Sequence, residues 1–104
     1  MKKQNRYPIK IDGRDVAIAG VLKRVLGADE ILDIIVIKPR VYYVRYRKCK
    51  GNDGNKFCWK EAVRVTFRGK YAYVSGSDEG VPLSDAEILI VNAFDFVARF
   101  LKTE

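Results

Sequence analysis

Tyrosines and basic residues alternate through the middle of this chain, and together they can bind a phosphate-bearing partner. Residues 38–70 contain eleven Lys and Arg but only two acidic residues, Asp53 and Glu61. Cationic side chains hold phosphates, and exposed tyrosine rings offer faces on which unpaired bases stack, whatever the base. The pattern therefore indicates a surface for single-stranded DNA or RNA with low sequence specificity.

The spacing of these residues depends on a predicted hairpin between two strands, 41–49 and 57–67. Asp53-Gly54 at the centre of the connection is a preferred pair for a two-residue type I′ turn. That turn defines the register, and directly opposite residues share a face of the sheet. One face is then mainly apolar and holds Tyr42, Val44, Tyr46, Trp59, Val63, Val65 and Phe67.

The other face of the hairpin is basic and aromatic, and a following strand over residues 71–75 extends it. We expect three tyrosines on this face to stack bases and five cations to hold phosphates, with three lysines around the hairpin tip assisting. A one-residue slip would mix the two faces, so their separation supports the register. The predicted binding residues are Tyr43, Tyr71 and Tyr73, then Arg45, Arg47, Lys60, Arg64 and Arg68, and finally Lys48, Lys50 and Lys56.

Crowding these cations onto one face costs stability, because Arg47 lies directly opposite Lys60 in the predicted register. A polyanion would relieve that repulsion. A single strand suits the face better than a duplex, because no predicted element is shaped for a groove. Three alternatives stay open: the face is a solvated surface, it is partly covered by the first helix, or it docks an acidic protein.

Cys49 and Cys58 fall directly opposite each other in the predicted hairpin. They can form a cross-strand disulfide, which would close a short loop and contribute about 2–3 kcal/mol. Because a cytosolic protein normally keeps its thiols reduced, two free buried thiols are the expected state. Two cysteines without histidine supply half of a zinc site, so zinc would require a dimer.

The chain matches no enzyme motif, and we expect neither catalysis nor a cofactor or metal. The sequence has no His, no glycine-rich phosphate loop and no nucleophile elbow. Asp78, Glu79 and Asp85 could together bind a divalent ion, as carboxylates do in nucleases. A solvated loop and the cap of the following helix explain the same three acids more simply.

The elements expected to position these residues form one α+β domain over 1–104 with a largely antiparallel sheet (order β-α-β-β-β-β-α). The long C-terminal helix begins at a capping box of Ser84 and Glu87, and most of its sides are apolar. We expect it to be buried within the domain or in a homodimer. The strand over 31–37 is apolar on both faces, which predicts cover on both sides. The remaining expected ranges are a strand at 6–11, a helix at 18–26 that stops at Gly27, and the C-terminal helix at 84–102.

Length and composition agree with a soluble intracellular domain. The 104 residues are 48% hydrophobic and carry a formal net charge of +7, with a pI of about 9.5. No apolar run is long enough for a membrane-spanning helix or a signal peptide, which favours a cytoplasmic location. The absence of His and the 32% of charged residues fit a thermophilic source.

Two segments resemble nucleic-acid-binding families. Residues 80–88, Gly-Val-Pro-Leu-Ser-Asp-Ala-Glu-Ile, follow a strand meander and open a long helix, which resembles the positive-cofactor-type transcriptional coactivators. The resemblance covers at most residues 30–102, and those coactivators usually have an aromatic residue where Ile88 stands. It implies single-stranded DNA binding on a curved sheet and dimerisation partly through the helix. Residues 11–16, the helix ending at Gly27 and residues 36–40 resemble the opening of the Alba-type archaeal chromatin proteins, although the second helix of that family is missing.

Overall fold

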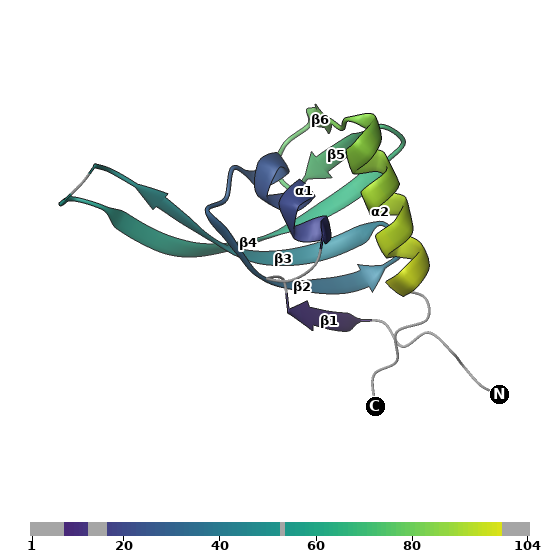
Figure 1. Cartoon of the computed structure of the whole chain (residues 1–104), viewed down its shortest axis with the longest axis horizontal. Coiled ribbons are helices and arrows are strands. Elements are labelled where there is room, and N and C mark those ends of the chain that lie inside the picture. The colour runs from purple at the N-terminus through teal and green to yellow at the C-terminus, as the bar shows by residue number, and fades with distance from the viewer. Residues whose placement is uncertain (1–7, 13–16, 53, 99–104) are drawn as a thin grey trace.

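The computed structural model describes residues 8–12, 17–52 and 54–98, which form a six-stranded antiparallel sheet and two helices (Figure 1). The predicted α+β class and antiparallel sheet are confirmed. The strands lie in the sheet in chain order. Within the described residues, neither helix has the length and apolarity needed to cross a membrane. The elements are β1 (Ile9–Asp12), α1 (Ala17–Leu26), β2 (Glu30–Lys38), β3 (Val41–Lys50), β4 (Phe57–Arg68), β5 (Tyr71–Val74), β6 (Gly80–Pro82) and α2 (Asp85–Ala98).

The short strand β6 was not predicted from the sequence, which indicated a loop there. It contains Gly80 and Pro82, and both residue types are unfavourable inside a strand. The strand pairs with β5, where Tyr73 lies opposite Gly80 and Tyr71 lies opposite Pro82. Proline is tolerated here because β6 is the edge strand, so the N–H that proline lacks is not needed for pairing with a further strand.

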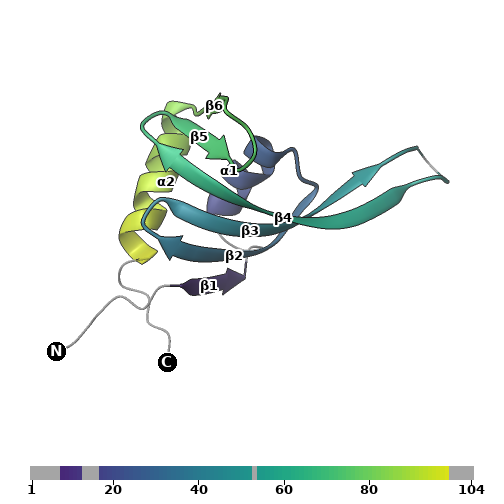
Figure 2. The ribbon, with the colours of Figure 1, turned by 180° about the vertical axis from the view of Figure 1, so that it is seen from behind.

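Both helices pack on one face of the sheet and cover its hydrophobic core (Figures 1 and 2). The apolar stripe of α1, which includes Ile18 and Leu22, is buried against core residues of the sheet such as Val44. The prediction that residues 31–37 are covered on both sides is wrong, because no described element lies over the second face. Ile35, on that second face of β2, is only half-buried.

The predicted register of the β3–β4 hairpin is confirmed. Tyr42 pairs with Val65 and Cys49 with Cys58, and residues 41–50 pair without interruption with residues 57–66. On the helix side the two strands bury large side chains, with Tyr42 and Val65 fully inaccessible to solvent. The separation into an apolar and a basic face therefore follows the alternation read from the sequence.

The connection between β3 and β4 is consistent with the predicted two-residue turn. The backbone N–H of Asn55 donates to the carbonyl of Asn52 at 2.9 Å, which closes a four-residue turn. Asp53, at its centre, lies outside the described residues. Gly51 precedes the turn with a φ of 111°, and a Cβ there would collide with the carbonyl oxygen of Asn55. Only glycine suits that position.

The predicted capping box at the start of α2 is confirmed, and its glutamate has a second role. The Glu87 N–H donates to Ser84 Oγ at 3.2 Å, and the Ser84 N–H donates to the Glu87 carboxylate at 2.9 Å. Arg24 of α1 donates to the same carboxylate at 2.5 and 2.8 Å and to the Pro82 carbonyl at 2.7 Å. Arg24 therefore joins α1 to both β6 and α2, and its hydrogen bond to Glu87 lowers the pKa of that carboxyl group.

Replacing Glu87 by Gln should reduce stability at neutral pH and flatten its acid dependence. The folded-state pKa of Glu87 is lowered, so its contribution is complete above the unfolded value of about 4.3 and is lost as the pH falls below it. We expect a loss of about 1 kcal/mol at pH 7, because the Arg24 side chain is 48% exposed and water screens the pair. Urea unfolding at several pH values would measure it. The exposed-loop variant Glu79→Gln is the control, and equal losses in both variants would contradict the prediction.

The helix α2 turns a polar side toward the turn between β2 and β3. Asp95, only 7% exposed, accepts hydrogen bonds from the Arg40 backbone N–H at 3.0 Å and from the Tyr42 hydroxyl at 3.1 Å. Asn92 accepts from the Arg40 guanidinium at 2.6 Å. The domain therefore does not bury most sides of this helix, contrary to one of the two expectations. Its outward side is apolar and carries Leu89, Phe96 and Val97.

Candidate nucleic-acid interface

The sheet face opposite the helices carries the predicted binding residues, and no described element lies over it (Figure 2). We call it the open face. Along β3, side chains of this face are exposed where their neighbours on the helix side are buried. The alternative in which α1 covers the face is wrong, since α1 packs on the other side. The open face includes Lys10, Glu30, Asp33, Ile35, Tyr43, Arg45, Arg47, Lys60, Ala62, Arg64, Thr66, Arg68, Tyr71 and Tyr73.

Three cations of the open face recur at every fourth residue of β4. Lys60, Arg64 and Arg68 are exposed, and within the described residues no ion pair engages them. Because a strand rises about 3.3 Å per residue, successive cations are about 13 Å apart along the strand. They form a positive track along β4 that a phosphate backbone can follow. We call these three residues the β4 track.

Two of the arginines predicted to bind phosphate form ion pairs with carboxylates of β2. Arg45 Nε lies 3.5 Å from Asp33 Oδ2, and Arg47 forms an ion pair with Glu30. Lys10 of β1 lies 4.0 Å from the same Asp33 carboxylate. The predicted crowding of Arg47 against Lys60 is thereby relieved within the protein. The open face thus has an ion-paired half on β1–β3 and a cationic half on β4 and β5.

A bulge in β2 brings these carboxylates to the open face. Ile31 pairs with Tyr46 on the helix side, whereas Asp33 pairs with Arg45 on the open face. Strict alternation would put Ile31 and Asp33 on the same face, and the extra residue Leu32 breaks it. The acidic residues Glu30 and Asp33 were not among the predicted site residues. Their only sequence signal is that acids interrupt an otherwise apolar strand.

The three tyrosines of the open face differ in how freely they can receive a base. Tyr43 is 39% exposed and Tyr71 is 45% exposed, whereas Tyr73 is half-buried. The Tyr73 ring lies over Gly80, where a Cβ would approach it to within 3.0 Å, and the Arg68 guanidinium stacks on the ring 5.4 Å from its centroid. Tyr71 is therefore the more accessible platform of β5.

A tyrosine stands on each side of the β4 track. Tyr43 on β3 pairs directly with Arg64, and Tyr73 on β5 pairs with Thr66 next to it. Since neighbouring strands are about 4.8 Å apart, the backbone positions of the two tyrosines are about 10 Å apart across the sheet. This arrangement is what the alternation of basic and aromatic residues predicted.

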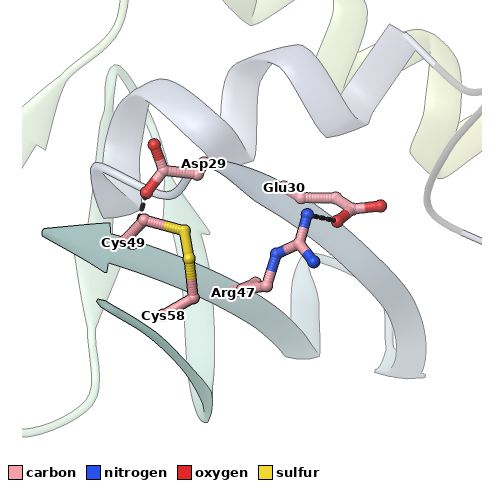
Figure 3. The surroundings of a disulfide bond; sticks show 5 residues. All are labelled: Asp29, Glu30, Arg47, Cys49 and Cys58. Atoms are coloured by element: carbon pink, nitrogen blue, oxygen red, sulfur yellow. Dashed lines mark hydrogen bonds and ion pairs between the residues drawn. A yellow bond between two sulfur atoms is a disulfide. The ribbon is translucent and has the colours of Figure 1, made fainter. Parts of the chain in front are cut away.

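The structure joins Cys49 and Cys58 in a disulfide, where two free buried thiols were the expected state (Figure 3). Their Cα atoms are 4.0 Å apart because they are direct partners in the hairpin, and Cys58 is exposed. The Cys49 backbone N–H donates to Asp29 Oδ2 at 2.6 Å. The disulfide thus ties together the two strands of the hairpin next to its attachment to the body of the domain.

The lysines predicted to assist at the hairpin tip lie on the part of the hairpin that extends beyond the sheet. Arg47 is the last residue of β3 that pairs with β2, so residues 48–50 pair only with residues 57–59. We call residues 48–52 and 54–59 the arm, and Figure 1 shows them reaching away from the body of the protein. Lys50 and Lys56 are exposed and Lys48 is half-buried. The arm therefore places positive charge away from the open face.

At the base of the arm, on the helix side, one carboxylate accepts two hydrogen bonds. The Tyr46 hydroxyl donates to Glu61 Oε1 and the Trp59 indole N–H donates to Glu61 Oε2, both at 2.6 Å. These bonds lower the pKa of Glu61. Burial, followed by the hydrogen bond to Glu61, raises the pKa of Tyr46 to about 12. Trp59, predicted on the apolar face, lies on that face but is only partly buried.

Tyr46 should be the source of a late tyrosinate step in an alkaline titration. Its folded-state pKa lies above the unfolded value of about 10, so it stabilises the fold below that pH and this contribution is lost as the pH rises toward about 12. Ultraviolet absorbance of tyrosinate, followed together with circular dichroism, would detect the step. It should disappear in Tyr46→Phe. An unchanged titration curve in that variant would contradict the assignment.

The described residues contain no group of three or more Cys, Asp or Glu side chains arranged to hold a metal ion. Asp78, Glu79 and Asp85, the acids considered for a divalent ion, are all exposed. Comparisons with models of protein families, with curated proteins and with solved structures found no match to this chain. The open face and the arm are therefore the features from which we infer a function.

Proposed function

We propose that this protein binds single-stranded nucleic acid through the open face, with low sequence specificity. The observation that carries the proposal is the uncovered cationic half, where the β4 track runs between exposed tyrosines. Phosphates would contact Lys60, Arg64 and Arg68, while bases would stack on Tyr43 and Tyr71. Stacking and phosphate contacts are both tolerant of sequence, which accounts for the low specificity.

A single strand fits the open face better than a duplex does. In a duplex the bases are stacked on one another, so tyrosine rings that lie on a broad sheet cannot reach their faces. Reading a duplex requires an element that enters a groove. The six-stranded open face is too wide for that purpose. The preference for single strands therefore depends on the exposed rings of Tyr43 and Tyr71.

Fluorescence anisotropy with labelled oligo-dT, its RNA counterpart and a duplex, across a salt series, tests this proposal. Each phosphate contact with a single strand adds roughly −0.7 to the log–log salt slope. We expect both single strands to bind more tightly than the duplex. No binding, or equal binding of all three that modest salt abolishes, would contradict the proposal and favour the docking of an acidic protein, for which Arg45 and Arg47 already show carboxylate pairing.

Replacing Tyr71 by Leu should weaken single-strand binding without changing its salt slope. The ring is 45% exposed and does not cover Gly80, so its removal disturbs the fold less than that of Tyr73. Loss of one stacked base should cost on the order of 1–3 kcal/mol, roughly 5- to 150-fold in affinity. The same anisotropy titration measures it. Wild-type affinity, or a shallower salt slope, would show that Tyr71 makes no stacking contact.

We also propose that α2 mediates a homodimer. Leu89, Phe96 and Val97 are 69%, 59% and 51% exposed, and with Ala93 they recur at the spacing of one helix face. The same stripe on a second copy is self-complementary, as a two-fold interface requires. Sedimentation should show a dimer for the wild type and a monomer for Phe96→Glu. Phe57→Glu, at an equally exposed phenylalanine far from α2, is the control. A monomeric wild type at high concentration would rule the dimer out.

A further inference from the structure

The arm carries exposed aromatic surface that the fold does not need. Phe57 is 65% exposed, and its ring stacks on Trp59 with centroids 5.5 Å apart and planes inclined by 30°. Residues 48–50 and 57–59 pair only with each other, and neither ring belongs to the hydrophobic core. A large apolar ring that served stability would be buried, because its contribution scales with the area removed from water.

Each ring of this pair has a lysine directly opposite it across the hairpin. Lys50 pairs with Phe57, and Lys48 pairs with Trp59. These four residues share the helix-side face of the arm, which is the face opposite the disulfide. The nearest acid on that face, Glu61, is engaged with Tyr46 and Trp59. Cations and exposed aromatic rings therefore occur together here as they do on the open face.

The local structure holds the aromatic pair in a defined position. The Trp59 indole N–H donates to Glu61, which orients the larger ring. On the other face of the arm, the Cys49–Cys58 disulfide links the two strands between the two lysine–aromatic rows. The fold already orders these two side chains, so stacking of a base on Phe57 loses little further side-chain entropy.

We propose that Phe57 and Trp59 form a second base-stacking site, at which Lys48 and Lys50 hold the phosphates of the same nucleic acid strand. This inference rests on the proposed function of the open face. Phe57 lies seven positions before Arg64 on β4, about 23 Å along the strand, and the two sites lie on opposite faces, so the ligand must also pass around the edge of the arm. Only a strand long enough to cover this distance reaches both sites. The arm thus makes affinity depend on the length of the ligand, because the second contact becomes intramolecular.

Trp59 is the single tryptophan of the chain, so its emission reports directly on the arm. We would titrate the unlabelled protein with oligo-dT of about 3 and about 20 nucleotides, lengths below and above the common single-strand site sizes. The longer oligomer should quench Trp59, whereas inorganic polyphosphate, which has charge but no bases, should not. Unchanged emission at saturation with the long oligomer, or equal quenching by polyphosphate, would overturn the inference.

A variant separates the arm from the open face. Phe57→Ala should weaken binding of the long oligomer by at least about 5-fold and leave binding of the short one unchanged. Tyr71→Leu, on the open face, should weaken both. If Phe57→Ala binds both oligomers like the wild type while Tyr71→Leu is impaired, the arm site is wrong and the open-face function stands. If no oligomer binds the wild type, both proposals fail.

Discussion

The double variant Lys60→Gln, Arg64→Gln should bind single strands about 25-fold more weakly than the wild type at 0.1 M salt, as roughly −0.7 per contact implies. Two phosphate contacts would be lost, so the log–log salt slope should become shallower by about 1.4. The substitutions should have little effect on stability, because both side chains are exposed and no described ion pair engages them. Salt-dependent anisotropy measures affinity and slope together.

The matched control removes the same charge from elsewhere on the surface. Lys23 on α1 is exposed, and α1 packs on the face of the sheet opposite the open face. Lys23→Glu lowers the net charge by two, as the double variant does, so it should lose only the long-range attraction that salt screens. If Lys23→Glu loses as much affinity as the double variant, the protein binds through its net charge. The β4 track would then have no specific role.

The β3–β4 hairpin could be predicted in detail because two independent signals agreed. The Asp53-Gly54 pair marked the turn, and that one register separated an apolar from a basic face. The structure has that register, with Cys49 opposite Cys58. The alternation of side chains between the two faces of a strand is a strong constraint, because a shift by one residue exposes every core side chain. This register also predicted which residues of β3, β4 and β5 share each face of the sheet.

The ion pairs of the open face could not be predicted in the same way. They depend on the bulge at Leu32, which places Glu30 on the same face as Asp33, so that Glu30 lies opposite Arg47 and Asp33 lies opposite Arg45. A bulge adds one residue to a strand without any necessary change in composition, so alternation alone gives the wrong face beyond it. Alternation therefore did not reveal that two of the five predicted phosphate-binding cations, Arg45 and Arg47, form ion pairs with carboxylates of β2.

Parity also fails to show where the hydrophobic core ends along a strand. Trp59 has the same parity as the buried Val65 and Phe67, but it lies on the arm, beyond the helices that cover them. The length of helix available to cover the sheet decides which residues of an apolar face are buried. The ten residues of α1 make a helix about 15 Å long, whereas the twelve residues of β4 make a strand about 40 Å long. The helix therefore cannot cover the whole length of the hairpin. Exposed aromatic residues on the arm follow from this mismatch.

The orientation of α2 was likewise hidden in the sequence, and it leads to the second large effect. Asp95 lies on the narrow polar stripe that a surface helix usually presents to solvent. In the structure this carboxylate is buried and satisfies two donors of the β2–β3 turn, the Arg40 N–H and the Tyr42 hydroxyl. Arg40 has a φ of 68°, a conformation that a non-glycine residue adopts only with support. Asp95 provides that support from the helix.

Replacing Asp95 by Ala should therefore destabilise the protein by about 2–4 kcal/mol, one of the largest losses available outside the apolar core. The buried donors of Arg40 and Tyr42 would lose the Asp95 carboxylate, and the ion pair of 3.7 Å between Arg40 Nε and Asp95 Oδ2 would be lost. Because the Arg40 side chain is 42% exposed, the ion pair contributes less than the hydrogen bonds. Urea unfolding monitored by circular dichroism would measure the change.

Two further variants distinguish the buried carboxylate from the exposed contacts around it. Asn92→Ala removes the exposed hydrogen bond with the Arg40 guanidinium and should cost less than about 1 kcal/mol. Arg40→Gly removes the side-chain contacts with Asn92 and Asp95 but keeps the backbone N–H, and glycine adopts a positive φ without strain. It should therefore be far milder than Asp95→Ala. If Arg40→Gly were as damaging, the guanidinium rather than the turn N–H would be what Asp95 holds, and the helix would be anchored by charge.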